Sequence, residues 1–229
     1  MQGFIPRFVP RSLVLWVYDV LSRVDRFKTG GRRQHLRQNA KAAVGVRPHF
    51  LKENGYAEDQ RLFRSLRYGR TDMAYAGCEI LAVLNALHFL EGVDGARFLP
   101  ALIAHFEGDG KVLDGLWGTS PRAMARFFRK RGFEVSETTC PADFDEAGRR
   151  SEVLILTFYN DAADIMAAVH TVCLTKTEEG FWVHNAGNGK AMGPYGSVTA
   201  ALRQQNGGRA GALMLLGISR RSKWKAFGD

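Results

Sequence analysis

Residues 78 to 90, which read CEILAVLNALHFL, decide the fold more than any other stretch of this 229-residue chain. Nearly every position is apolar, so the predicted helix has no face suited to water and is expected to be buried. Its first residue is Cys78. An apolar content of 45% is enough for one sizeable core built around this helix.

The elements predicted on both sides of this helix indicate an α+β fold. Residues 57 to 68 are predicted to be helical, and a loop over 70 to 77 leads to Cys78. Further helices are predicted over 96 to 106 and after Pro121. The rest of the pattern predicts strands near 133–136, 153–158, 168–175, 181–185 and 212–218, with a short helix over 198–204. Helices followed by an antiparallel sheet are typical of α+β proteins.

Cys78 is the first candidate functional residue. A thiol attacks as its thiolate, and the N-terminus of a helix stabilises that form through the helix dipole and free backbone N–H groups. Gly77 permits a close approach to the backbone at this point. Position alone does not decide the matter, because a cysteine beside an apolar helix is also a common core residue.

His170 and Asn185 are the other two candidates. His170 begins a predicted strand, and Asn185 ends the next one across a short hairpin, so the two residues are expected to lie side by side. An Asn there can accept a hydrogen bond from one ring nitrogen and leave the other free to take a proton from the thiol. Cys78, His170 and Asn185 are therefore the predicted catalytic residues.

The net charge of +9 is located at the ends of the chain. Residues 1 to 50 hold ten Lys/Arg and two Asp, residues 217 to 229 hold four Lys/Arg and one Asp, and the middle sums to −2. The charge pattern therefore argues against a nucleic-acid partner for the central domain. We expect a basic N-terminal segment over 1–56, a core domain over 57–219 and a basic tail over 220–229.

An amphipathic helix is predicted from Ser12, a good N-cap, to about Gly30. Its arginine flanks and Trp16 suit a helix on an anionic membrane surface, so residues 1–50 are a candidate membrane contact. A helix packed on its own domain shows the same stripe and is the alternative. The apolar run from Leu13 to Tyr18 is too short for a membrane span or an ordinary signal peptide.

The three cysteines, Cys78, Cys140 and Cys173, form no CxxC pair and cannot complete a disulfide framework. A reducing compartment is expected, with the cytoplasm as the default. No cofactor or metal is expected. His170 and Cys173 are three apart on a strand and so face opposite ways, while His88, His105 and His184 are predicted to be structural.

In this arrangement the chain resembles the papain-like cysteine peptidases, specifically the bacterial double-glycine (bacteriocin-leader) peptidase-like family, over about residues 57 to 217. The resemblance lies in four short motifs in the family order: YAGCE at 75–79, GTSP at 118–121, VHTV at 169–172 and VHNAG at 183–187. It implies a papain-like fold in which the buried cysteine helix packs against a sheet that carries His and Asn. It also implies Cys78 as nucleophile, His170 as general base and acid, and Asn185 as the residue that orients the base. The substrate would be a peptide or an acylated small molecule.

One residue departs from the family pattern. Many relatives have Gln six residues before the cysteine, where it completes the oxyanion hole, and this chain has Asp72 there. An ionised carboxylate cannot donate a hydrogen bond to an oxyanion. If the loop lies as in relatives, Asp72 and Gly77 belong to the oxyanion region; otherwise Asp72 caps a loop or helix. Hydrolysis through a Cys78 acyl-enzyme is the leading expectation, with acyl transfer to an amine, or a non-catalytic peptide-binding module, as alternatives.

Overall fold

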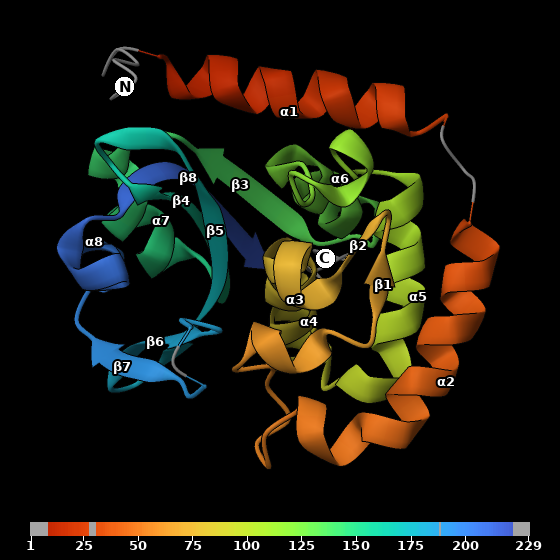
Figure 1. The fold of residues 1–229 in the computed structure, drawn as a ribbon. Coiled ribbons are helices and arrows are strands. Elements are labelled where there is room, and N and C mark those ends of the chain that lie inside the picture. The colour runs from red at the N-terminus through yellow and green to blue at the C-terminus, as the bar shows by residue number, and fades with distance from the viewer. Residues whose placement is uncertain (1–8, 28–30, 188, 222–229) are drawn as a thin grey trace, which may run out of the picture.

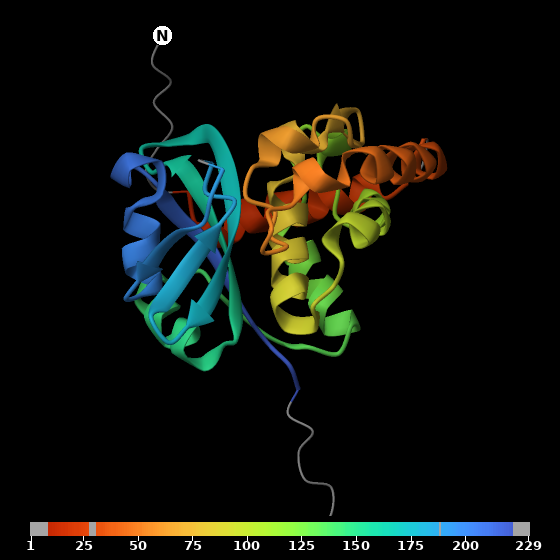
Figure 2. The same cartoon turned by 90° about the horizontal axis from the view of Figure 1, so that it is seen from below.

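The computed structural model describes residues 9–27, 31–187 and 189–221, with side chains described outside 45–50 and 164–168. It is an α+β structure in which α2 to α6 lie on one side and the antiparallel sheet, with α7 and α8 on its outer face, lies on the other (Figure 1). Seen from below, the two halves lie side by side, and α1 crosses behind them (Figure 2). The expected α+β class is confirmed. None of the helices in these ranges combines the length and the apolarity that crossing a membrane requires.

Helix α4 (Cys78–Glu91) is the predicted apolar helix, and it is buried over most of its length. It packs against the sheet on one side and against α5 (Gly95–Gly108) on the other. Gly92 ends the helix with a φ of 66°, a left-handed conformation that glycine adopts without steric cost. The first residue of α4 therefore lies where the helical half meets the sheet.

The helical half is completed by elements whose starts follow ordinary capping rules. Asp72 caps the short α3 (Met73–Ala76), Asp94 caps α5, and Pro121 occupies the first turn of α6 (Pro121–Lys130). Short 3-10 turns lie at η1 (Gln60–Phe63) and η2 (Leu113–Gly115). The predicted helices after 78, 96 and 121 are confirmed.

The six-stranded sheet has the order β3-β8-β4-β5-β6-β7, with every neighbouring pair antiparallel. The strands are β3 (Glu134–Thr138), β4 (Val153–Asp161), β5 (Asp164–Thr177), β6 (Gly180–His184), β7 (Met192–Tyr195) and β8 (Gly211–Ser219). Strand β7 was not predicted. Strand β6 pairs with β5 only up to Cys173 and His184, so the earlier part of β5 extends beyond it.

Alternate residues of the central strands enter two apolar clusters. Val153 and Ile155 of β4 belong to the cluster around α4, whereas Leu154, Leu156 and Phe158 belong to the cluster on the other face. That second face is covered by α7 (Phe144–Arg150), which was not predicted, and by α8 (Val198–Arg203). The sheet is thus buried on both faces, which explains its long apolar runs.

The segment before Cys78 differs from the prediction. Residues 57 to 68 were expected to be one helix, but they form η1 and β1 (Arg67–Tyr68), which pairs with β2 (Thr71–Asp72). The Asn39 side chain makes hydrogen bonds to both the N–H and the carbonyl of Arg67, at 2.7 and 2.9 Å. These tertiary bonds hold an extended backbone that local helix propensity does not favour.

The basic N-terminal segment is helical and packs on the core. Helix α1 (Arg11–Asp25) begins one residue before the predicted cap at Ser12, without a side-chain cap, and Leu15 joins the core cluster. Helix α2 (Arg32–Phe50), which is not among the predicted elements, packs along α5, where Arg32 Nε donates to the Ala104 carbonyl at 2.7 Å. The predicted end of the first helix near Gly30, residues 1–8 and most of the basic tail (222–229) lie outside the described ranges.

Candidate active site

Cys78 lies on the wall of a pocket of about 490 Å³. Helical-half residues such as Trp117 form one side, Tyr159 and Val169 of the sheet form another, and Val17 and Tyr18 of α1 form a third. The Tyr18 ring packs against Trp117 with their centroids 5.8 Å apart. The pocket is therefore mainly apolar, and α1 covers part of it.

The Cys78 thiol is buried, and the pKa of this thiol is raised well above its ordinary value. Burial is the largest cause, followed by the charge of Glu79 and a hydrogen bond with the Glu79 carboxyl. A hydrogen bond from the Thr171 backbone acts in the opposite direction. The effects of burial and of Glu79 therefore exceed any stabilisation of the thiolate by the start of α4, which is worth at most about 2 kcal/mol.

Glu79 is the acidic residue of this site, and it was not among the predicted site residues. Its side chain is buried on the pocket wall, and its Oε2 atom has no hydrogen-bond partner among the residues that the structure describes. Burial raises the pKa of Glu79 to about 7, against hydrogen bonds from its own N–H, the thiol and the Thr119 backbone. The carboxyl thus changes its charge near neutral pH, directly beside the thiol.

His170 lies in β5 next to Thr171, whose backbone lies beside the Cys78 thiol. The His170 ring points to the other face of the sheet, together with its cross-strand partner Phe158, and the two ring centroids are 5.6 Å apart. The structure therefore does not bring the His170 ring to the thiol. The His170 Nε2 atom lies 2.9 Å from the carbonyl oxygen of Asn185. Because a carbonyl only accepts, Nε2 carries the proton and Nδ1 keeps its lone pair. Burial lowers the pKa of His170, which favours the neutral ring. In the part of the chain described, no hydrogen bond joins this ring to the thiol.

Asn185 reaches His170 through its backbone and not through its side chain. Its side chain faces Gln60, accepting from the Gln60 N–H at 3.0 Å, and its own N–H donates to Glu58 at 3.1 Å. The residue has a φ of 62°, a left-handed conformation in which Asn is one of the better tolerated residues. These contacts fix the direction of the Asn185 carbonyl, which orients His170 as the predicted amide would have done.

Asp72 has a structural role in this arrangement. Its Oδ1 accepts from the Tyr75 N–H at 3.0 Å and so caps α3. This contact supports the capping alternative weighed for Asp72. Gly77 has no room for a side chain, because a Cβ there would collide with the Met73 carbonyl. Gly77 is therefore needed for the close packing of α3 against the start of α4.

His184 points to the side of β6 that faces the helical half, and its ring has structural partners on every side. Its Nδ1 lies 2.6 Å from Glu58, its Nε2 lies 2.9 Å from the Thr175 hydroxyl, and the ring stacks on Tyr56 with a centroid distance of 4.0 Å. Glu58 also receives the N–H of Asn185. The His184–Glu58 pair therefore helps to hold Asn185, and through it His170.

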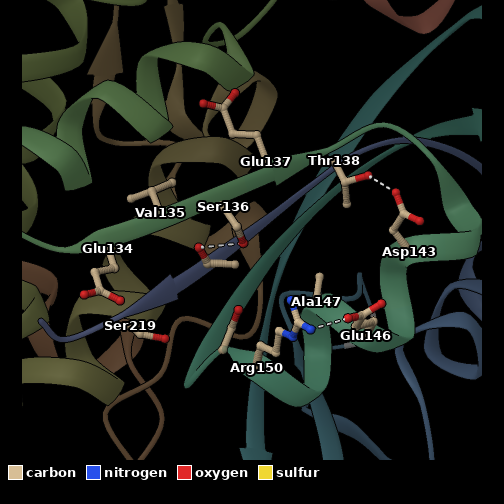
Figure 3. Close-up of a pocket in the computed structure, with 12 residues that line it drawn as sticks. Glu134, Val135, Ser136, Glu137, Thr138, Asp143, Glu146, Ala147, Arg150 and Ser219 are labelled. Carbon is tan, nitrogen blue, oxygen red and sulfur yellow. Dashed lines mark hydrogen bonds and ion pairs between the residues drawn. The ribbon is translucent and has the colours of Figure 1, made fainter. Parts of the chain in front are cut away.

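A second hollow, of about 520 Å³, lies between the edge of the sheet and α7 (Figure 3). Several of its polar side chains bond to one another: Arg150 pairs with Glu146 at 2.6 Å, and Thr138 bonds to Asp143 at 3.2 Å. It contains neither a cysteine nor a histidine. The Cys78 pocket is therefore the stronger candidate for chemistry.

Sequence reasoning missed Glu79, the α1 side chains of the pocket and the Asn185 carbonyl. A signal existed for Glu79 alone, because an acidic residue in the first turn of an all-apolar helix must be buried beside the cysteine. Comparison with known proteins supplies no further guide: no family model, no curated protein and no solved structure matches this chain.

Proposed function

We propose that this protein is a cysteine-dependent acyl-transfer enzyme of the papain-like class, which most readily hydrolyses a peptide or amide bond. One observation carries the proposal: the Cys78 thiol lies at the start of α4 on the wall of a mainly apolar pocket, beside the backbone of Thr171. A nucleophile and a space for an acyl group thereby occupy one place. The proposed base, His170, lies one residue away from Thr171 on β5 with its ring on the other face of the sheet, so the mechanism also requires a rearrangement that brings its Nδ1 atom to the thiol.

In the proposed mechanism the Nδ1 atom of His170 takes the thiol proton, and the Cys78 sulfur attacks the substrate carbonyl carbon. The oxygen becomes an oxyanion, which the backbone N–H of Cys78 helps to hold. When the bond to the leaving group breaks, His170 returns the proton to that group and the acyl chain stays on sulfur as a thioester. Water, or an amine in the acyltransferase alternative, then releases the acyl group.

The Asn185 carbonyl has one task in this mechanism. It holds the proton on Nε2 and so keeps Nδ1 available as the base. The carbonyl also stabilises the imidazolium that forms during proton transfer, because an N–H bond to a carbonyl strengthens when the ring becomes charged.

The pH dependence follows from the two groups beside the thiol. Ionised Glu79 opposes formation of the thiolate, so activity should fall as the pH rises above about 7. Protonated His170 cannot accept a proton, and its pKa is lowered, so the acid limb should lie below the ordinary histidine value. We therefore expect a bell-shaped profile with its maximum on the acidic side of neutrality.

A second candidate, a non-catalytic module that binds an apolar peptide or acyl chain, is favoured by the raised pKa of the thiol. The two candidates differ in the reactivity of Cys78. An activated Cys78 should react with iodoacetamide at pH 6 far faster than the exposed Cys140, despite its burial, whereas an inert core thiol should react more slowly.

The test uses p-nitrophenyl acetate with a Cys140→Ser protein, which removes the exposed thiol. We expect acetyl transfer to Cys78, found by mass spectrometry of its peptide, and a loss of about 10²-fold or more in turnover in Cys78→Ser. His170→Ala should lose activity to a similar degree. Full turnover in Cys78→Ser with an intact fold would exclude the proposed mechanism.

A further inference from the structure

Helix α1 has two apolar faces, and only one of them is used inside the molecule. Leu15 and Tyr18 face the core, whereas Trp16, Val24 and Phe27 are 55%, 56% and 85% exposed. Together with Val20 they make a stripe along the outside of the helix and of the turn that follows it at Phe27, with spacings of three and four residues. Figure 1 shows that α1 is the outermost element on its side of the molecule.

The acidic residues of this helix are turned inward. Asp19 is buried and pairs with Arg126 at 2.6 Å, and buried Asp25 accepts from the backbone N–H of Asp114. They are the only two acids among the first 50 residues, against ten Lys/Arg. The exposed charges of the described part of this segment are therefore all positive.

Both ends of α1 are fastened to the body. At the start, the Arg11 side chain donates to the carbonyls of Ala212 and Thr139, at 2.8 and 3.2 Å. Just beyond the helix, Arg26 pairs with Asp109 at 3.1 Å. The helix is consequently fixed on the body before any partner binds. Its outer apolar side chains remain in contact with water, because no described residue covers them.

We propose that the outer face of α1, with Trp16, Val20, Val24 and Phe27, binds the surface of an anionic lipid bilayer. An exposed apolar stripe on a helix whose exposed charged side chains are all cationic is the combination that such a surface attracts. The apolar residues enter the boundary between headgroups and acyl chains, while Arg23, whose side chain is 72% exposed, remains at the level of the lipid phosphates. This surface does not depend on any chemistry at Cys78.

The test measures co-flotation of the full chain with vesicles of phosphatidylcholine, alone or with about 30% phosphatidylglycerol. We expect binding to the anionic vesicles only, weakening by about tenfold or more between about 50 and 500 mM salt. The double variant Trp16→Ser, Val24→Ser should bind about tenfold more weakly or worse. A control, Val44→Ser with Leu62→Ser, removes exposed apolar side chains from α2 and η1 and should change binding less than about twofold.

Melting curves by circular dichroism establish that the variants are folded. Vesicles that contain brominated lipid give an independent measure of whether Trp16 enters the bilayer. The brominated lipid should quench part of the tryptophan fluorescence, and Trp16→Phe should remove the quenched part. Failure to bind anionic vesicles, equal losses in the control variant, or unchanged quenching in Trp16→Phe would overturn the proposal. Self-association of the wild type that the double variant abolishes, without vesicle binding, would assign the stripe to a second copy of the chain instead.

Discussion

Replacing Glu79 with Gln should change how the stability of this protein depends on pH. The pKa of Glu79 is raised to about 7 in the folded protein from an ordinary value of 4.5. Between these two values the folded chain keeps a proton that the unfolded chain has released. The free energy of unfolding must therefore fall as the pH rises through this window, and the loss is complete above about pH 7.

The size of the effect follows from the shift. Each pKa unit corresponds to about 1.4 kcal/mol, so a rise from 4.5 to about 7 amounts to about 3 kcal/mol. Gln has nearly the same shape as the protonated acid and carries no charge at any pH. The Glu79→Gln variant should thus gain about 3 kcal/mol relative to wild type between pH 5 and pH 8.

Urea unfolding at several pH values between 5 and 8 measures this difference directly, because other titrating groups cancel between wild type and variant. Glu146→Gln is the control, since Glu146 is an exposed carboxyl on α7 and its replacement should leave the two curves parallel. If unfolding free energy depends on pH in the same way for Glu79→Gln and for wild type, the buried carboxyl does not hold its proton. The raised pKa assigned to Glu79 would then be wrong.

The same variant should make the thiol more reactive. The Glu79 charge and its hydrogen bond both raise the pKa of Cys78, and Gln removes the charge. Iodoacetamide should therefore label Cys78 faster at pH 8 in Glu79→Gln than in wild type, by about tenfold for each unit by which the thiol pKa falls. Peptide mapping in a Cys140→Ser background identifies the labelled residue, and an unchanged rate would contradict the assigned role of Glu79.

Two further predictions concern residues near the site. Asp72→Ala should cost about 1 kcal/mol of unfolding free energy through loss of the α3 cap, and Asp72→Asn should recover most of it; in urea titrations, an Asp72→Ala protein as stable as wild type would rule out the cap. Asn185→Gly should keep the His170 bond and most turnover, because glycine retains both the carbonyl and the left-handed backbone, whereas Asn185→Ala should be less stable. Loss of turnover in a folded Asn185→Gly protein would mean that the side chain, and not the carbonyl, orients the base.

The sequence predicts best those elements whose pattern of apolar residues is compatible with only one type of secondary structure. The helix from Cys78 and the hairpin of β5 and β6 belong to this group, since the helix is an unbroken apolar run and the two apolar strands are joined by a short turn. The helix expected over residues 57 to 68 was wrong because Asn39, far away in sequence, fixes Arg67 in an extended conformation. Helix α2 was missed because polar contacts such as His35 with Glu107, and small residues such as Ala42 and Ala43, make its contacts with the body and leave no apolar stripe in the sequence.

In the candidate site, too, contacts between residues that are distant in the sequence could not be predicted. Residue types and order indicated Cys78, His170 and Asn185, and the structure brings His170 and Asn185 into contact. The sequence could not tell that the contact uses the Asn185 carbonyl, because every residue has one and its direction depends on a left-handed turn held by Glu58 and Gln60. Backbone roles of this kind depend on tertiary contacts and leave no mark in residue type.

The thiol is held in its protonated form by two features that can each be reversed. Burial is the larger one, and α1 contributes to it, because Val17 and Tyr18 close one side of the pocket. The second is the charge of Glu79, which a single proton removes. Opening the pocket at α1 would return water to both groups, and this would lower the thiol pKa and also bring the Glu79 pKa back toward its ordinary value. Solvation stabilises both the Cys78 thiolate and the Glu79 carboxylate, but the negative charge of that carboxylate destabilises the neighbouring thiolate. Exposure alone is therefore less effective than exposure combined with a protonated Glu79, or with a substrate group that compensates its charge.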